Sequence, residues 1–224
     1  MFVKICGITS EEDALLAVAV GADAIGFVFA PSKRQVAPTR VADIVKRLPQ
    51  EVLTVGVFRN EAPRRVIQIV HQAGLQAAQL HGNETPDVVQ EVKADVRTVF
   101  KAVVAGSRAF EDAEAFGADA VLVDAPSPGS GHVFDWRLAE DAPTAVPLIL
   151  AGGLTPDNVG EAIDKVRPWG VDVSSGVERS PGVKDPILVR DFIRVAKAHD
   201  EATFESPTPL GHEPYNWQED ATWR

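Results

Sequence analysis

GADAIGFVF at residues 21–29 is the first of four variants of one pattern, which returns as GLQAAQLHG at 74–82, GADAVLVDA at 117–125 and GVDVSSGVE at 170–178. Each variant follows a stretch with helical character and leads into a short apolar run. A glycine just past a helix can take the left-handed conformation that ends the helix. A short apolar run without long alternation is typical of a parallel strand buried on both faces. The four segments therefore predict a repeated unit of helix, glycine and buried strand.

The segments between these variants complete the repeat. Thr85-Pro86, Thr155-Pro156 and Asp185-Pro186 each have the pattern of an N-cap residue followed by proline in the first helical turn. Thr9 and Glu12 have capping-box spacing. We expect strands near 2–6, 23–29, 52–57, 76–80, 97–103, 119–124, 147–151 and 170–174. We expect helices over 10–20, 38–48, 61–73, 84–93, 107–116, 135–140, 155–165 and 185–198.

This strict alternation of strand and helix predicts the fold class, which is α/β. Alternation implies parallel strands joined by right-handed crossovers. Eight units of about 25 residues fit one closed (β/α)8 TIM barrel. A doubly wound open sheet is the alternative, and it is disfavoured because no Gly-x-Gly-x-x-Gly turn follows the first strand. We expect the barrel domain to occupy 1–198 and an acidic, aromatic C-terminal extension to occupy 199–224.

Composition excludes several function classes. The net charge of −10 disfavours a nucleic acid or an anionic membrane surface as partner. The longest apolar runs, such as Ala14–Val20, are too short to cross a bilayer, and the first residues lack signal-peptide features, so we expect a cytoplasmic protein. Cys6 is the one cysteine, which excludes an intramolecular disulfide. No two histidines have the i, i+4 spacing of a helical zinc site, so no metal is expected.

Active sites of this fold lie on the loops that follow the strands, and two of these loops have the composition of a phosphate site. Gly152 and Gly153 follow the seventh expected strand, where their backbone allows an anion to approach closely. Ser174, Ser175 and Gly176 follow the eighth strand and offer hydroxyl and amide donors. Tight turns without a ligand are the structural alternative.

Cys6 and Asp124 end the first and sixth expected strands. A lone cysteine is often a buried, unreactive small side chain. At a strand end, however, a thiol can face a substrate, and a nearby helix N-terminus could lower its pKa. Asp124 either caps its loop or acts as an acid–base group. A proton donor and a proton acceptor on opposite sides of a barrel mouth suit an isomerase.

Two more strand-end residues are candidates for substrate binding. The planar fork of Arg34 suits a substrate carboxylate, with Lys33 as the close rival and a solvated loop arginine as the alternative. His81 either orients the substrate or caps its strand.

Taken together, the strand ends resemble the phosphoribosylanthranilate isomerase family, an enzyme family of tryptophan biosynthesis. The similarity covers residues 1 to about 198 in unbroken order. The matching stretches are KICGIT at 4–9, GFVFAPSKRQV at 26–36, GVF at 56–58, QLHG at 79–82, VLVDA at 121–125, GSGHVFDW at 129–136, LAGGL at 150–154 and VDVSSGVERSPGVKD at 171–185.

The resemblance implies an Amadori rearrangement of N-(5-phosphoribosyl)anthranilate to an aminodeoxyribulose phosphate. It implies that Asp124 is the general acid that opens the furanose and that Cys6 is the general base that removes the C2′ proton. Arg34 matches the position that meets the anthranilate carboxylate, and Asp172 and His81 match positions near the sugar. The glycines and serines after the seventh and eighth strands match the phosphate site. The resemblance implies no cofactor, a small sugar-phosphate substrate, and a monomer or homodimer.

The chain departs from the family pattern in two places. The loop at 126–131 reads PSPGSG, where the family usually has a Gly-Gly-Thr-Gly-like turn, and Pro128 stiffens it. The chain also continues for about 25 residues past the usual end of the family. Those residues hold four aromatics (Phe204, Tyr215, Trp217 and Trp223), which is unusual for a disordered end. We expect a structural strap against the barrel or a second subunit; a loosely held extension is the alternative.

Two rival functions stay open at this point. The first is a dual-substrate isomerase that also accepts the analogous intermediate of histidine biosynthesis; the cysteine in KICG argues against it, since that related family generally uses paired aspartates. The second is a non-catalytic barrel that binds a sugar phosphate, which would not require both Cys6 and Asp124.

Overall fold

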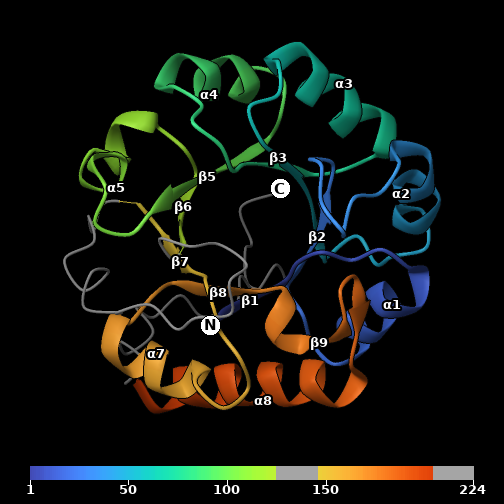
Figure 1. Ribbon diagram of the computed structural model, residues 1–224, viewed down its shortest axis with the longest axis vertical. Helices are drawn as coiled ribbons and strands as arrows, with labels where there is room; N and C mark the ends of the chain where they lie inside the picture. The colour runs from blue at the N-terminus through green and yellow to red at the C-terminus, as the bar shows by residue number, and fades with distance from the viewer. Residues whose placement is uncertain (125–145, 204–224) are drawn as a thin grey trace, which may run out of the picture.

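The computed structural model describes residues 1–124 and 146–203, and these residues form a closed barrel of eight parallel strands inside a ring of helices (Figure 1). The barrel closes between its first and last strands, where Phe2 pairs with Gly170 and Lys4 with Asp172. The strands are β1 (Phe2–Ile5), β2 (Ala24–Val28), β3 (Leu53–Phe58), β4 (Ala77–Leu80), β5 (Thr98–Val104), β6 (Ala120–Asp124), β7 (Leu148–Leu150) and β8 (Gly170–Val173). The closed barrel confirms the predicted fold class and excludes the open sheet.

Helices connect consecutive strands in the part of the chain that the structure describes. They are α1 (Glu11–Ala19), α2 (Pro38–Val45), α3 (Pro63–Ala73), α4 (Pro86–Lys93), α5 (Arg108–Glu111), α7 (Val159–Val166) and α8 (Pro186–Thr203). Two short 3-10 helices, η1 (Ala113–Phe116) and η2 (Ser175–Val177), and a small hairpin of β9 (Glu178–Ser180) and β10 (Val183–Lys184) complete the fold. The fifth predicted helix is thus two short pieces, and the sixth, at 135–140, lies outside the described residues.

Three of the four pattern glycines end helices as predicted. Gly21, Gly74 and Gly117 have φ of 98°, 67° and 61°. Gly170 does not, because Arg167 takes the left-handed position after α7 with φ 50°. Gly170 instead lies in β8, where an added Cβ would come within 2.9 Å of the Phe2 carbonyl oxygen, so close strand packing explains this glycine.

The helix starts show two correct N-cap positions and two corrections. Thr85 precedes Pro86 at the start of α4 as predicted, although its side chain makes no capping hydrogen bond. The Asp185 side chain accepts hydrogen bonds from the first turn of α8, as predicted. For α1, however, Ser10 is the N-cap and its Oγ accepts from the Asp13 N–H, while the Thr9 hydroxyl donates to Gly182. The predicted start at 155 is also wrong, since a turn comes first and α7 begins at Val159.

The barrel interior is divided into an apolar layer and a polar layer. Small and medium apolar side chains fill the N-terminal part: Ala24, Val55, Ala77, Phe100, Ala102, Ala120, Leu122, Ile149 and Ala151. Side chains alternate along a strand, so Lys4, Gln79, Asp124 and Asp172 point to the same inner face and are buried. The polar layer therefore lies toward the carboxyl ends of the strands.

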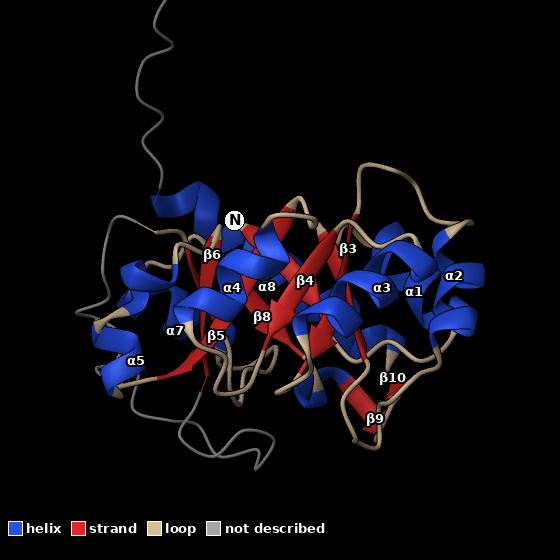
Figure 2. Cartoon of the chain, turned by 90° about the horizontal axis from the view of Figure 1, so that it is seen from above, coloured by secondary structure: helices blue, strands red, loops and turns tan. Residues whose placement is uncertain are grey.

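The two ends of the barrel differ in what they carry. Figure 2 shows the N-terminus at one end and the β9–β10 hairpin, which follows β8, at the other. Helix α8 runs to Thr203, five residues past the predicted domain end at 198, and residues 204–224 lie outside the described part. Among the described residues, no helix is both long and apolar enough to cross a membrane.

Candidate active site

The first half of the site is built on β1 and β8. Lys4 and Asp172 occupy the same register position on these neighbouring strands, and Lys4 Nζ lies 2.9 Å from Asp172 Oδ1. Cys6 comes two residues after Lys4, directly past β1, and is 7 % exposed. A Cβ added to Gly26 of β2 would lie 2.9 Å from Cys6 Sγ and 3.1 Å from Lys4 Nζ. The glycine therefore leaves the space in which thiol and ammonium lie side by side.

The electrostatics of this half differ from the expectation of a lowered thiol pKa. Burial raises the pKa of Cys6, and the nearby Lys4 ammonium opposes that shift without cancelling it. Burial would lower the pKa of Lys4, but Asp172 and Cys6 outweigh it, so the pKa of Lys4 is raised. The structure thus assigns the counter-charge of the thiol to Lys4 rather than to a helix N-terminus.

The second half lies across the mouth, on β4 and β6. His81 Nε2 is 3.1 Å from Asp124 Oδ2, so the structure brings two predicted site residues together. Gln79, two residues before His81, places its amide Nε2 2.9 Å from His81 Nδ1. In the barrel order, β7 and β8 separate β6 from β1, so Asp124 and Cys6 lie on opposing walls.

Arg34 already has a carboxylate partner in this structure. Its Nε and Nη2 each donate to Glu178 at 2.8 Å, and Glu178 also accepts from Lys184 at 3.0 Å. Burial would raise the pKa of Glu178, but Arg34 and Lys184 together lower it. Two of the five guanidinium N–H donors are used in this pair, which leaves three for another acceptor.

The side chain of Arg34 reaches the mouth of the barrel. A Cβ added to Gly7 would lie 2.6 Å from Arg34 Cδ and 2.7 Å from Ser174 Oγ. Gly7 has φ 74°, and this glycine allows both side chains to pack over the end of β1. Arg34 and Ser174 are therefore neighbours beside Cys6.

The two candidate phosphate loops lie against each other. Gly152 and Gly153 have φ of 87° and 69°, which L-residues with a side chain rarely adopt. A Cβ added to Gly176 would lie 1.8 Å from the Leu154 carbonyl oxygen. Ser174 and Ser175 come directly before Gly176, at the start of η2. The loops after β7 and β8 thus form one surface on which only glycine fits at these three positions.

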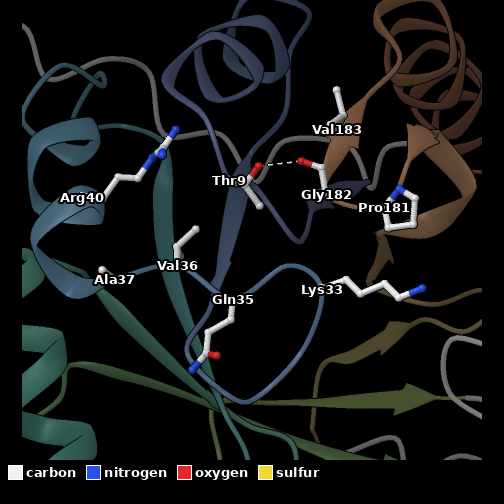
Figure 3. A pocket seen from close by; sticks show the side chains of 9 residues that line it. All are labelled: Thr9, Lys33, Gln35, Val36, Ala37, Arg40, Pro181, Gly182 and Val183. Carbon is white, nitrogen blue, oxygen red and sulfur yellow. Dashed lines mark hydrogen bonds between the residues drawn. The ribbon is translucent and has the colours of Figure 1, made fainter.

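Lys33 lies apart from this arrangement. It lines an exposed pocket of about 420 Å3 between the β2–α2 connection and the β9–β10 hairpin. Figure 3 shows this pocket with the hydrogen bond between Thr9 and Gly182 on its wall. The Thr9 hydroxyl donates to the Gly182 carbonyl oxygen at 2.5 Å. The lining residues are Thr9, Lys33, Gln35, Val36, Ala37, Arg40, Pro181, Gly182 and Val183. Adjacent residues 33 and 34 therefore serve two different surfaces.

Three site residues were missed from the sequence. Lys4 and Gln79 stand inside the quoted motifs KICGIT and QLHG, two positions before Cys6 and His81. That spacing places each on the same strand face as its neighbour, a signal that could have found them. Glu178 had no such signal, because its contact with Arg34 spans 144 residues.

Some predictions fall outside the residues that the structure describes. They are the loop at 126–131, the GSGHVFDW stretch at 129–136 and the aromatic extension. Within the described ranges, no group of three or more His, Cys, Asp or Glu side chains is arranged to hold a metal ion.

Comparison with known proteins places this site in a family. Residues 3–195 match the family model of N-(5'phosphoribosyl)anthranilate (PRA) isomerase. The N-(5'-phosphoribosyl)anthranilate isomerase of Desulforudis audaxviator is 49% identical over 199 residues, which cover 87% of this chain and 97% of that protein.

Solved structures agree with this match. The phosphoribosyl anthranilate isomerase of Thermus thermophilus superposes with a TM-score of 0.83 at 40% identity and covers 88% of this chain and 99% of its own. A phosphoribosyl anthranilate isomerase in complex with reduced 1-(o-carboxyphenylamino)-1-deoxyribulose 5-phosphate superposes with a TM-score of 0.78 at 41% identity, with the same coverage. The family model and the relatives cover the barrel that carries every residue of the candidate site, and the chain belongs to the N-(5'-phosphoribosyl)anthranilate isomerase family.

Proposed function

We propose that this chain converts N-(5-phosphoribosyl)anthranilate to 1-(2-carboxyphenylamino)-1-deoxyribulose 5-phosphate, the aldose–ketose isomerisation of tryptophan biosynthesis. The observation that carries the proposal is the pairing of Cys6 with Asp124 on opposing walls of one barrel mouth, inside a fold shared with this family. An Amadori rearrangement needs a proton given at one atom and a proton taken at another. Two titratable side chains facing a substrate from opposite sides meet that need.

Asp124 acts as the general acid. It donates a proton to the ring oxygen of the ribose, and the C1′–O bond breaks to give an open-chain iminium. Asp124 is buried, and His81 lies 3.1 Å away as a partner that can share the proton.

Cys6 acts as the general base. Its thiolate removes the C2′ proton of the iminium, the electron pair forms the C1′–C2′ double bond, and the resulting enolamine tautomerises to the ketone. The reaction is an isomerisation with no net oxidation, so its balance needs no cofactor. Lys4 supports this step because its ammonium favours the thiolate in a site where burial disfavours it.

The two anionic ends of the substrate need separate binding groups. The ligand named for one solved relative carries both a carboxyphenyl group and a 5-phosphate. The three remaining donors of Arg34 suit the carboxylate. Gly152, Gly153 and the Ser174–Gly176 turn suit the phosphate, through backbone N–H groups and hydroxyls. Asp172 and His81, on either side of the mouth, suit the sugar hydroxyls.

The remaining expectations stay predictions. They are a cytoplasmic location, a monomer or homodimer, and an extension at 199–224 that acts as a strap. The dual-substrate isomerase is the alternative that an assay with both substrates decides.

One assay tests the proposed reaction. The purified chain is mixed with freshly prepared phosphoribosylanthranilate, and the loss of anthranilate fluorescence is followed. We expect saturable turnover with this substrate and none with the aminoaldose phosphate of histidine biosynthesis. Binding without turnover would support the non-catalytic barrel, and turnover of both compounds would support the dual-substrate isomerase.

A further inference from the structure

Gln79 holds one buried polar atom that the fold does not satisfy. The residue is 1 % exposed, on the inner face of β4. Its amide nitrogen contacts His81 Nδ1, but its Oε1 has no hydrogen-bond partner, and it is the one buried side-chain atom of this kind among the described residues. Buried polar atoms are nearly always satisfied, so an exception beside a proton donor calls for a reason.

The contact between Gln79 and His81 fixes where a proton sits. An amide nitrogen can only donate, so the Nδ1 that faces it must carry a lone pair. The ring proton is then on Nε2, which donates to Asp124 Oδ2 at 3.1 Å. In this orientation the His81–Asp124 pair holds one proton and Asp124 is a carboxylate. That is the pair after the general acid has acted.

The opposite orientation of the Gln79 amide corresponds to the His81–Asp124 pair before the general acid has acted, when the pair holds two protons. A half turn about the Cγ–Cδ bond of Gln79 exchanges Oε1 and Nε2 at nearly the same positions. Oε1 can only accept, so Nδ1 must then carry a proton. A second proton lies between Nε2 and Asp124 Oδ2, and it is the one available to the ring oxygen of the substrate. Each orientation leaves one atom of the Gln79 amide without a hydrogen-bond partner, so the two orientations are close in free energy.

We propose that Gln79 is a positioning residue whose amide turns over with the proton content of the His81–Asp124 pair and so keeps Asp124 able to give and recover its proton. The proposal rests on the proposed function, because it assumes that Asp124 is the general acid. After Asp124 gives its proton, a ring with Nδ1–H would point the Nε2 lone pair at a carboxylate. The amide nitrogen removes that repulsion by favouring the Nε2–H form.

The other charged groups near the pair do not take this place. On β5, Lys101 points away from the barrel interior and pairs with Glu84 at 2.9 Å. On β1 and β8, Lys4 and Asp172 pair with each other beside Cys6. Strand β3 has no titratable side chain between Leu53 and Phe58. Among the described residues of β4 and of the strands beside it, Gln79 is therefore the group that contacts His81 Nδ1.

The first test is spectroscopic and uses the wild-type chain without substrate. Ring 15N signals of His81, assigned with a His81→Gln variant, distinguish nitrogens that carry a proton from those that carry a lone pair. We expect the Nε2–H form at high pH and a doubly protonated ring–carboxylate pair at low pH. The side-chain amide signals of Gln79 should change with the same midpoint. Amide signals that stay constant through the His81 titration would overturn the proposal.

Two variants test the role in turnover. Gln79→Met keeps the size of the side chain but removes donor and acceptor, so kcat should fall about tenfold and KM should change less than about twofold. Gln79→Glu supplies a fixed acceptor, so the doubly protonated form of His81 should persist to a pH about one unit higher. Gln76→Met makes the same chemical change at an exposed position directly before β4, and kcat and the His81 spectrum should stay as in the wild type. A Gln79→Met variant with normal kcat and an unchanged ring spectrum would show that Gln79 only fills space.

Asp124→Asn separates this proposal from the proposed function. If that variant retains the wild-type rate, Asp124 is not the general acid and the assignment of the acid fails. The spectra of the wild type and of the Gln79 variants test the positioning role without substrate. If Asp124→Asn loses turnover while Gln79→Met does not, only the role of Gln79 is refuted.

Discussion

Lys4 and Asp172 form a buried ion pair, 2.9 Å between Nζ and Oδ1, across the seam where β1 closes the barrel on β8. The pair lies directly beside the Cys6 thiol. Closure of the barrel brings the Asp172 carboxylate to Lys4, and this carboxylate helps to raise the pKa of the Lys4 ammonium beside a thiol whose own pKa burial raises.

Replacing Lys4 should impair the base more than substrate binding. In Lys4→Met the burial and the Asp172 charge that raise the pKa of Cys6 lose their counterweight, so the rising low-pH limb of the kcat profile, where the base loses its proton, should move to higher pH. An opposite charge at this range shifts a pKa by about 1–3 units, which predicts a loss of about tenfold or more at neutral pH. Cys6 is the sole cysteine, so its rate of alkylation against pH measures the shift.

The exposed Lys46 provides the control for this substitution. Lys46→Met should leave the alkylation profile unchanged. A Lys4→Met profile that coincides with the wild type would contradict the role of the ammonium. The same variant should lower the free energy of unfolding by about 3–5 kcal/mol, since it leaves Asp172 buried without its partner.

A second buried pair, Glu84 with Lys101, makes a prediction about acid stability. Burial would raise the pKa of Glu84, but Lys101 and a backbone N–H outweigh it, so the folded-state pKa lies below the usual 4.5. A lowered carboxyl pKa stabilises the fold above the unfolded value, and that stability is lost as the pH falls through the folded value. The wild type should therefore lose stability below about pH 4.5.

In Glu84→Gln the free energy of unfolding should depend less steeply on pH below about pH 4.5. At neutral pH the variant should be less stable than the wild type by about 3–5 kcal/mol, because the Lys101 ammonium loses its carboxylate partner. Glu91→Gln, an exposed change on α4, should cost less than about 0.5 kcal/mol. Urea unfolding at pH 7 and pH 3 measures both variants. An equally steep acid limb in Glu84→Gln would show that other carboxyl groups determine it.

The glycine at 176 should affect phosphate affinity through the shape of the backbone. In Gly176→Ala the new Cβ would lie 1.8 Å from the Leu154 carbonyl oxygen, so the loops after β7 and β8 must move apart. We expect KM to rise at least about tenfold, with a smaller effect on kcat. Competitive inhibition by inorganic phosphate should weaken in parallel.

Gly74→Ala is the matched glycine control, since its added Cβ meets nothing closer than 3.8 Å. Its left-handed φ should cost about 1 kcal/mol in stability while KM stays constant. Similar KM changes in the two variants would mean that loop shape after β8 has no special part in binding.

The C-terminal extension supports a prediction from composition alone. Four aromatics in residues 204–224 should bury apolar surface against the barrel or a second subunit. A chain truncated after Thr203, where α8 ends, should therefore have a lower Tm or a changed oligomeric state in sedimentation. If both stay as in the full chain, the extension is loosely held.

The sequence predicted the strands well because each is a short apolar run between clear helix ends. Each of the eight barrel strands lies within about two residues of its expected bounds. The β9–β10 hairpin was not predicted, since strands of three and two residues have no periodicity to detect. Ser10 replaced Thr9 as a cap because the Thr9 hydroxyl has a partner in that distant hairpin.

The site was predictable in its positions but not in its pairings. Strand ends identify Cys6, His81 and Asp124 because a barrel brings all its strand ends to one mouth. The partners of these residues depend on register and loop closure between distant segments. The Arg34–Glu178 pair shows the limit, since the guanidinium expected to meet a substrate carboxylate also meets one from the protein itself.

The most direct test compares the turnover of Cys6→Ala and Asp124→Asn with the wild type on phosphoribosylanthranilate, alongside the Kd of each for reduced 1-(o-carboxyphenylamino)-1-deoxyribulose 5-phosphate. Positioned acid–base groups contribute about 10²–10⁴-fold each, so kcat should fall by that factor in either variant while Kd changes only a few fold. Near-normal kcat in both variants would contradict proton transfer between Asp124, substrate and Cys6.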